Sequence, residues 1–173
     1  MAAGDASTRS SLEKFHAWSI ADREGFWAEQ AGLIDWQVPF ERVLDYANPP
    51  FARWFVGGRT NLCHNAVDRH LATRRDAPAL IHVSTETDSE CVYTFGELHR
   101  EVVRMASIMR ALGVGRGDRV IIYMPMVPEA AFAMLACARI GAIHSVVFGG
   151  FASHSLASRI DDASPVLVVS ADA

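Results

Sequence analysis

Apolar positions in the second half of the chain alternate between short continuous runs and longer stretches with helical spacing. The runs Asp118–Met124, Ala142–Phe148 and Val166–Ser170 are rich in β-branched residues and predict strands. Between them, Pro128–Ile140 and Ser153–Ala163 predict helices, the first with proline in its first turn. Strands that alternate with helices pair in parallel through right-handed crossovers. The second half therefore predicts an α/β fold with a parallel β-α-β-α-β unit.

The region before this unit has equally clear start and stop signals. Thr94 and Glu97 have the spacing of a capping box, which predicts a helix from residue 95, and Gly113 predicts its left-handed end. The runs Pro78–Val83 and Cys91–Tyr93 predict the two strands of a hairpin.

The first half has weaker periodicity. Residues 1–20 begin with small polar residues and predict a disordered lead-in, and Ala21–Leu33 predicts a helix. Trp36–Phe55 combines aromatic residues with prolines and predicts an irregular segment that covers a neighbouring surface. Asn61–Thr73 predicts one further helix.

Composition narrows the class of protein. A chain of 173 residues, 50% hydrophobic and 21% charged, can bury a substantial core. Its formal charge of −4 and its dispersed arginines give no basic field, so a nucleic acid is not expected as a partner. The apolar stretch Val120–Ala138 is split by Pro125 and Pro128, so a membrane span is not expected either.

The thiols and imidazoles do not form a recognisable metal or catalytic motif. The three cysteines lack paired spacing, which argues against a disulfide framework or a zinc site and favours the cytoplasm. His64 and His70 are too far apart to share a helix face, and His144 in an apolar strand is expected to be a core or near-site residue. His154 at a helix start could cap free N–H groups or meet an anion. Asp161 and Asp162 are interpreted as solvated residues at a helix end.

The best candidate for a ligand contact is the glycine pair Gly149 and Gly150, which follows the strand ending at Phe148. Ligands of parallel sheets lie beyond the carboxyl ends of strands, and glycine allows positive φ and close approach of the backbone. The pair could equally be a turn into the next helix. The chain contains no dinucleotide fingerprint, Walker loop, nucleophile elbow or HExxH helix.

Four strings carry a resemblance to a known family. They are FWAEQAGLIDW at 26–36, PPFARWFVGGRTNLCHNAVDRH at 49–70, GVGRGDRVIIYMPMVPEA at 113–130 and CARIGAIHSVVFGGFASHSLASRIDDA at 137–163. The chain resembles the N-terminal part of the large domain of short-chain acyl-CoA synthetases, which are AMP-forming members of the adenylate-forming superfamily. GRTNLCHNAVDRH and FGGFASHS are more similar to the members that use propionate than to those that use acetate, although acetate stays open as the alternative.

The resemblance implies an enzyme of two steps. A carboxylate attacks the α-phosphate of ATP to give an acyl-adenylate and pyrophosphate, and the thiol of coenzyme A then displaces AMP. It implies a division into an N-terminal acetyl-CoA synthetase-type segment at 21–85 and the start of the AMP-binding domain at 86–173. The complete enzyme would use ATP, coenzyme A and Mg²⁺.

Few of the family's functional residues carry over to this chain. The FGG of the family corresponds to Phe148, Gly149 and Gly150, which the resemblance assigns to coenzyme A. No catalytic or metal-binding residue carries over, and the one lysine, Lys14, lies in the lead-in. This chain alone is expected to be inactive without the remainder of the ligase, and to bind none of the substrates tightly.

Two functions of other classes stay open. The chain could be a separate nucleotide-binding module, or a partner domain that is inert until it is joined to other parts. An incomplete parallel sheet would then expose an edge and promote association.

Overall fold

The computed structural model describes residues 3–150 and 153–172. The chain divides into two compact units, residues 1–60 and 61–173. The segment boundary expected between residues 85 and 86 lies inside the second unit, in the loop between two paired strands.

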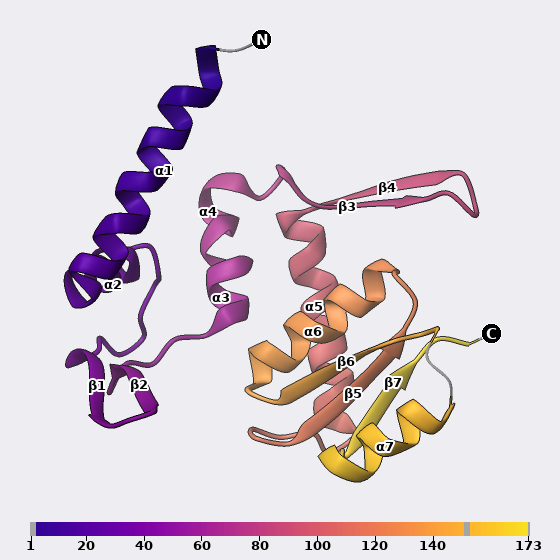
Figure 1. The fold of residues 1–173 in the computed structure, drawn as a ribbon. Helices are drawn as coiled ribbons and strands as arrows, with labels where there is room; N and C mark the ends of the chain where they lie inside the picture. The colour runs from indigo at the N-terminus through magenta and orange to yellow at the C-terminus, as the bar shows by residue number, and fades with distance from the viewer. Residues whose placement is uncertain (1–2, 151–152, 173) are drawn as a thin grey trace. The chain divides into compact units, whose positions relative to one another are not determined.

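The first unit contains two helices and one hairpin (Figure 1). Helices α1 (Ala3–Ala21) and α2 (Arg23–Ala31) are followed by the antiparallel strands β1 (Arg42–Asn48) and β2 (Phe51–Val56). The helix predicted at 21–33 is confirmed by α2. Two other expectations differ from the structure, because residues 3–20 are helical and much of 36–55 forms paired strands.

Aromatic contacts explain both differences. Phe26 is buried, and the rings of Phe15 and Trp18 on α1 each lie 4.8 Å from its ring in an edge-on arrangement. This packing gives α1 an apolar face, which the small polar residues at its start do not predict. A second group, Trp36, Phe40 and Phe55, has ring centroids 5.2–5.4 Å apart and fixes the base of the hairpin.

The second unit begins with a helix that is interrupted. The sequence predicts one helix over 61–73, whereas the structure has α3 (Leu62–Ala66), the 3-10 helix η1 (Asp68–His70) and α4 (Leu71–Arg74). The break falls at Val67, whose backbone is not helical (φ −129°, ψ −62°) and whose side chain is fully buried. Burial of this residue takes precedence over the helical spacing.

The hairpin and the helix that follow it agree with the sequence. Strands β3 (Pro78–Ser84) and β4 (Ser89–Thr94) pair antiparallel and lead into α5 (Phe95–Ala111). At its start, Glu97 N donates to Thr94 Oγ1 (3.2 Å) and Thr94 N donates to Glu97 Oε2 (2.9 Å), so the predicted capping box is confirmed.

The predicted parallel unit is also confirmed. Strands β5 (Arg119–Met124), β6 (Ile143–Phe148) and β7 (Leu167–Ser170) form a parallel sheet in the order β6-β5-β7, with α6 (Pro128–Ile140) and α7 (Ser153–Ala163) between them in sequence. Helix α6 ends at Gly141, whose φ of +76° is the left-handed conformation expected of a C-cap glycine.

Each face of this sheet meets different helices. Val120 and Ile122 of β5 are fully buried in a core with residues of α5 and α6. Ile121 points to the opposite face and is also fully buried. Helix α7 lies on that face (Figure 1), where its Leu156 lines a hollow together with Tyr123 and Val168. The apolar stretch from β5 to α6 is therefore a buried α/β element, and no helix among the described residues is long and apolar enough to cross a membrane.

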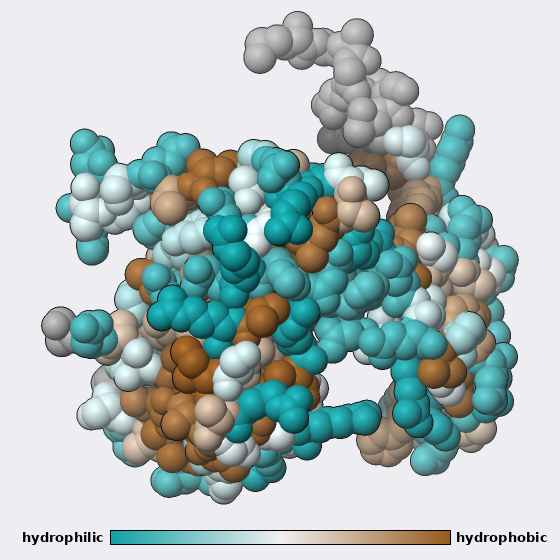
Figure 2. Space-filling view, turned by 180° about the vertical axis from the view of Figure 1, so that it is seen from behind, coloured by the Kyte–Doolittle hydropathy of each residue, from teal (hydrophilic) through white to brown (hydrophobic). Residues whose placement is uncertain are grey.

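Strand β6 is an outer strand of the sheet. Its residues Ile143, Val146 and Phe148 are exposed, and Figure 2 shows hydrophobic surface gathered over the part of the chain that carries this sheet. The expectation of a core position for His144 is wrong, because this residue also lies on β6 and is exposed. His154 is exposed near the start of α7, and its interpretation as a cap depends on residues 151–152, which lie outside the described residues.

Replacement of the cap residue tests the capping box. Thr94→Ala removes the acceptor for the Glu97 backbone N–H and is expected to lower the free energy of unfolding by about 1 kcal/mol. Urea denaturation followed by circular dichroism measures the change. Ser107→Ala is the matched control, because its hydroxyl lies on the exposed side of the same helix and should change stability by less than about 0.5 kcal/mol.

The same box predicts a pH dependence. The backbone and hydroxyl hydrogen bonds of Thr94 lower the pKa of the Glu97 carboxyl below its usual 4.5. A carboxyl whose pKa is lower in the folded state stabilises that state above its unfolded pKa, and this contribution disappears as the pH falls through the folded pKa. The stability difference between the chain and Glu97→Ala should therefore be present at pH 7 and shrink below about pH 4.5. A difference that stays constant down to pH 2 would contradict this account.

Candidate functional site

The candidate site lies at the carboxyl edge of the parallel sheet. The register pairs Met124 with Phe148 and Tyr123 with both Val147 and Ser170, so the three strands end at nearly the same level. A ligand of such a sheet contacts the segments that leave these strand ends. In this chain, those segments are 125–127, 149–150 and 171–172.

The turn at Phe148–Gly150 is held against the neighbouring strand. The Tyr123 hydroxyl donates a hydrogen bond to the Gly149 carbonyl (2.9 Å). A Cβ atom on Gly149 would lie 3.3 Å from backbone atoms of Met124 and Pro125, which is tighter than ordinary packing allows. Neither Gly149 nor Gly150 has a positive φ, so the sequence argument from backbone freedom is wrong here. Glycine is needed at 149 because two backbones approach closely.

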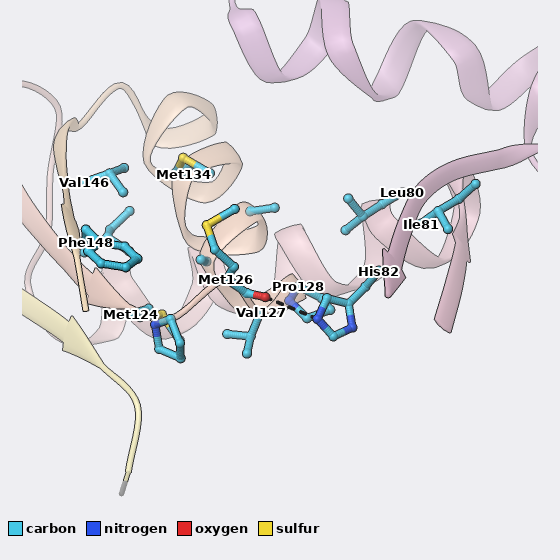
Figure 3. A pocket seen from close by; sticks show the side chains of 14 residues that line it. Leu80, Ile81, His82, Met124, Met126, Val127, Pro128, Met134, Val146 and Phe148 are labelled. Carbon is cyan, nitrogen blue, oxygen red and sulfur yellow. Dashed lines mark hydrogen bonds between the residues drawn. The ribbon is translucent and has the colours of Figure 1, made fainter. Parts of the chain in front are cut away.

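Phe148 faces an apolar hollow on the α6 side of the sheet edge (Figure 3). The hollow has a volume of about 450 Å³ and lies between the end of β6, the start of α6 and strand β3. It is lined by aliphatic, aromatic and thioether side chains, including Leu80, Met124, Met126, Met134, Val146 and Phe148. At the rim, His82 Nε2 lies 3.2 Å from the Met126 carbonyl oxygen, and this contact joins β3 to the segment after β5.

Gly149 faces a second hollow on the α7 side. Its volume is about 520 Å³, and it has more polar groups, among them the hydroxyls of Tyr123 and Ser170 and the carboxylate of Asp172. The turn therefore separates two spaces, with the Phe148 ring on one side and the Gly149 backbone on the other. Of the three predicted residues, Phe148 lines the first hollow and Gly149 the second, while Gly150 leaves room for the Phe148 ring, which a Cβ there would approach to 2.6 Å.

The residues at this sheet edge are suited to binding a ligand rather than to catalysing a reaction. An exposed aromatic ring beside an apolar hollow can stack on a planar ring, and an adjacent backbone can come close to the rest of such a ligand. Among the described residues, those lining the two hollows include no lysine or arginine to neutralise phosphate. No group of three or more His, Cys, Asp or Glu side chains within 3–150 and 153–172 could hold a metal ion, so no step through Mg²⁺ is derived for this chain.

Sequence reasoning missed the residues that support the turn. The sequence places Tyr123 and Met124 only in a strand, and His82 only in a hairpin. The signal available for the first two is their position at the end of the central strand, which parallel pairing places beside residues 148–149. Nothing in the sequence places His82 beside Met126, because this contact joins elements 44 positions apart.

Two family patterns together match residues 12–173. The pattern described as "Acetyl-coenzyme A synthetase N-terminus" matches residues 12–66, and "AMP-binding enzyme" matches residues 67–173. The second match covers more than half of the chain, and the chain therefore belongs to the family of AMP-binding enzymes.

The curated relatives of the chain include propionate–CoA ligases and acetyl-coenzyme A synthetases. The chain is 65% identical over 163 residues to propionate–CoA ligase of Escherichia coli, covering 94% of the chain and 26% of that protein. It is 63% identical to propionate–CoA ligase of Salmonella typhimurium with the same two coverages. Acetyl-coenzyme A synthetase of Thiobacillus denitrificans is 56% identical over 153 residues, which is 88% of the chain and 23% of that protein.

A solved structure has the same fold. Acetoacetyl-CoA synthetase from Streptomyces lividans superposes with a TM-score of 0.83 at 35% identity, over 90% of this chain and 24% of that one. The α/β fold of the N-terminal region of an adenylate-forming synthetase is thus confirmed. The chain spans about a quarter of the length of the curated relatives it matches.

A larger residue at 149 tests the close approach. Gly149→Val places three additional carbons against the Met124–Pro125 backbone and should lower the free energy of unfolding by about 1–3 kcal/mol. Thermal unfolding measures this effect. Gly115→Val is the control, because a Cβ at 115 meets only one atom, an Asp118 oxygen at 3.5 Å. Equal losses in both variants would contradict the packing role of Gly149.

Proposed function

We propose that this chain is the N-terminal part of an AMP-forming propionate–CoA ligase. The observation that supports this most strongly is the 65% identity to a propionate–CoA ligase over 94% of the chain. In the first step, a carboxylate oxygen of propionate attacks the α-phosphorus of ATP and pyrophosphate leaves. In the second step, the sulfur of coenzyme A attacks the acyl carbon, the bond to AMP breaks, and the thiol proton is released.

The contribution of this chain is one wall of the coenzyme A site. Phe148 provides an exposed ring on which adenine can stack, and the glycine backbone at 149–150 allows the nucleotide to come close. The ATP motifs, the acyl pocket and the groups that perform the chemistry belong to the remainder of the ligase. ATP, coenzyme A and Mg²⁺ are substrates and cofactor of that complete enzyme, for which we propose a cytoplasmic location.

Acetate is the alternative substrate. Acetyl-coenzyme A synthetases match the chain at 48–56% identity, below the two propionate–CoA ligases. This ranking favours propionate. A comparison of kcat/KM for propionate and acetate in the complete enzyme decides between them.

The coenzyme A contact has a direct kinetic test. In the complete ligase, Phe148→Ala is expected to raise the KM for coenzyme A about tenfold, because base–aromatic stacking contributes about 1–3 kcal/mol. Propionate-dependent exchange of pyrophosphate into ATP, which reports the first step, should not change. Ile143→Ala is the matched control, since Ile143 is exposed on the same strand at its opposite end. An unchanged KM for coenzyme A in Phe148→Ala would refute the assignment.

The 173-residue chain alone should release no pyrophosphate with propionate and ATP. Its single lysine lies at position 14, and the residues described at the sheet edge offer no cationic group for a triphosphate. A coupled pyrophosphate assay with the complete ligase as positive control measures this. Turnover by the chain alone would overturn the division of roles proposed here.

A further inference from the structure

The segment Asn61–His70, here called the clasp, is attached to the rest of the second unit by a set of polar contacts and by two buried side chains. It comprises α3 and η1 and corresponds to the NLCHNAVDRH part of a string that carries the family resemblance. Only two of its side chains, Cys63 and Val67, are buried in the core. The clasp begins directly after the junction between the two compact units.

One end of the clasp is held by a side-chain amide that serves two helices. Asn61 Nδ2 donates to the carbonyl oxygens of Ala138 (2.9 Å) and Arg139 (3.2 Å) at the end of α6. Asn61 Oδ1 accepts from the His64 backbone N–H (3.1 Å) and so caps α3. A single residue thereby connects the start of one helix to the end of another.

The other end is held by the Asp68 carboxylate. Both of its oxygens accept from Arg139 Nη1, at 2.9 and 3.1 Å, and two imidazoles face it, with His64 Nδ1 at 3.9 Å and His99 Nε2 at 3.7 Å. The same Arg139 nitrogen lies 3.3 Å from Cys63 Sγ. This cluster joins the clasp to α6 and, through His99, to α5.

These attachments are modest in energy. The Asp68 and Arg139 side chains are both about one-quarter exposed, so water screens their attraction. The two buried side chains of the clasp are small, whereas the core of α5, β5 and α6 buries many more apolar groups. Segments with few buried contacts open at lower free energy than the core that supports them.

We propose that the clasp opens as a local unit while the rest of the second unit stays folded, and that the ion pair between Asp68 and Arg139 stabilises the closed conformation. The far end of the opening segment is anchored by the His70 ring, which lies 4.9 Å from the Phe95 ring on α5. An open clasp exposes the Cys63 thiol. This inference is independent of the substrate of the ligase.

Alkylation of two buried cysteines measures the opening. Cys63 belongs to the clasp and its side chain is fully buried beneath it, whereas Cys137 of α6 is fully buried against α5, with its Sγ 3.8 Å from Met109 Sδ. In this chain, Asp68→Asn and Arg139→Met should each increase the rate of N-ethylmaleimide labelling at Cys63 about three- to fivefold, with no change at Cys137. Mass spectrometry of the digested protein resolves the two sites.

Comparison of the two variants distinguishes opening of the clasp from a change in the ionisation of the Cys63 thiol. Burial raises the pKa of the Cys63 thiol, and the hydrogen bond and charge of Arg139 oppose this, while the charge of Asp68 adds to it. Loss of Arg139 therefore raises this pKa further and slows labelling, whereas loss of Asp68 lowers it. Faster labelling of Arg139→Met runs against its effect on ionisation and therefore reports greater access to the thiol, whereas ionisation alone could accelerate Asp68→Asn.

Arg104→Met is the control for the two clasp variants. Arg104→Met removes an arginine ion pair with Glu101 on the same unit (3.8 Å) and should leave both cysteines unchanged. Equal acceleration at Cys63 and Cys137 would show global destabilisation and overturn the proposal. Unchanged labelling of Cys63 in both clasp variants would overturn it as well.

Discussion

Burial of β5 is the constraint on which the second unit depends. Val120, Ile121 and Ile122 are consecutive and fully buried, although neighbouring residues of a strand point to opposite faces. Such burial requires a strand on each side and cover above and below, which β6, β7, α5, α6 and α7 provide. Burial of β5 on both faces therefore determines that helices must cover both sides of the sheet.

The candidate site follows from the same constraint. Because β5 pairs in parallel with both neighbours, the segments that leave the three strands emerge at one edge. The turn at Phe148–Gly150 is supported there by the Tyr123 hydroxyl and by the backbone of Met124 and Pro125. A binding surface arises where regular pairing stops and backbone groups become available.

Much of this architecture could be predicted from local signals. The capping box at Thr94, the left-handed glycine Gly113 after α5 (φ +92°) and the strand ranges in the second half all depend on residues close in sequence, and all are confirmed. Predictions failed where contacts between residues distant in sequence determine the local structure. Helix α1 is stabilised by the ring of Phe26 on another helix, and the break at Val67 depends on a core formed by α5 and α6. The two hollows at the site likewise join segments whose proximity no local pattern encodes.

Asn61 has a consequence for the chemical ageing of the protein. Its amide nitrogen donates to two carbonyls of α6, while its amide oxygen accepts from the backbone of α3. Hydrolysis of this amide to a carboxylate would preserve the acceptor and remove the donor. The cap of α3 would survive, but an anion would then face two carbonyl oxygens at the negative end of α6. One spontaneous covalent change, which replaces NH₂ by oxygen, would thus convert attraction between two helices into repulsion.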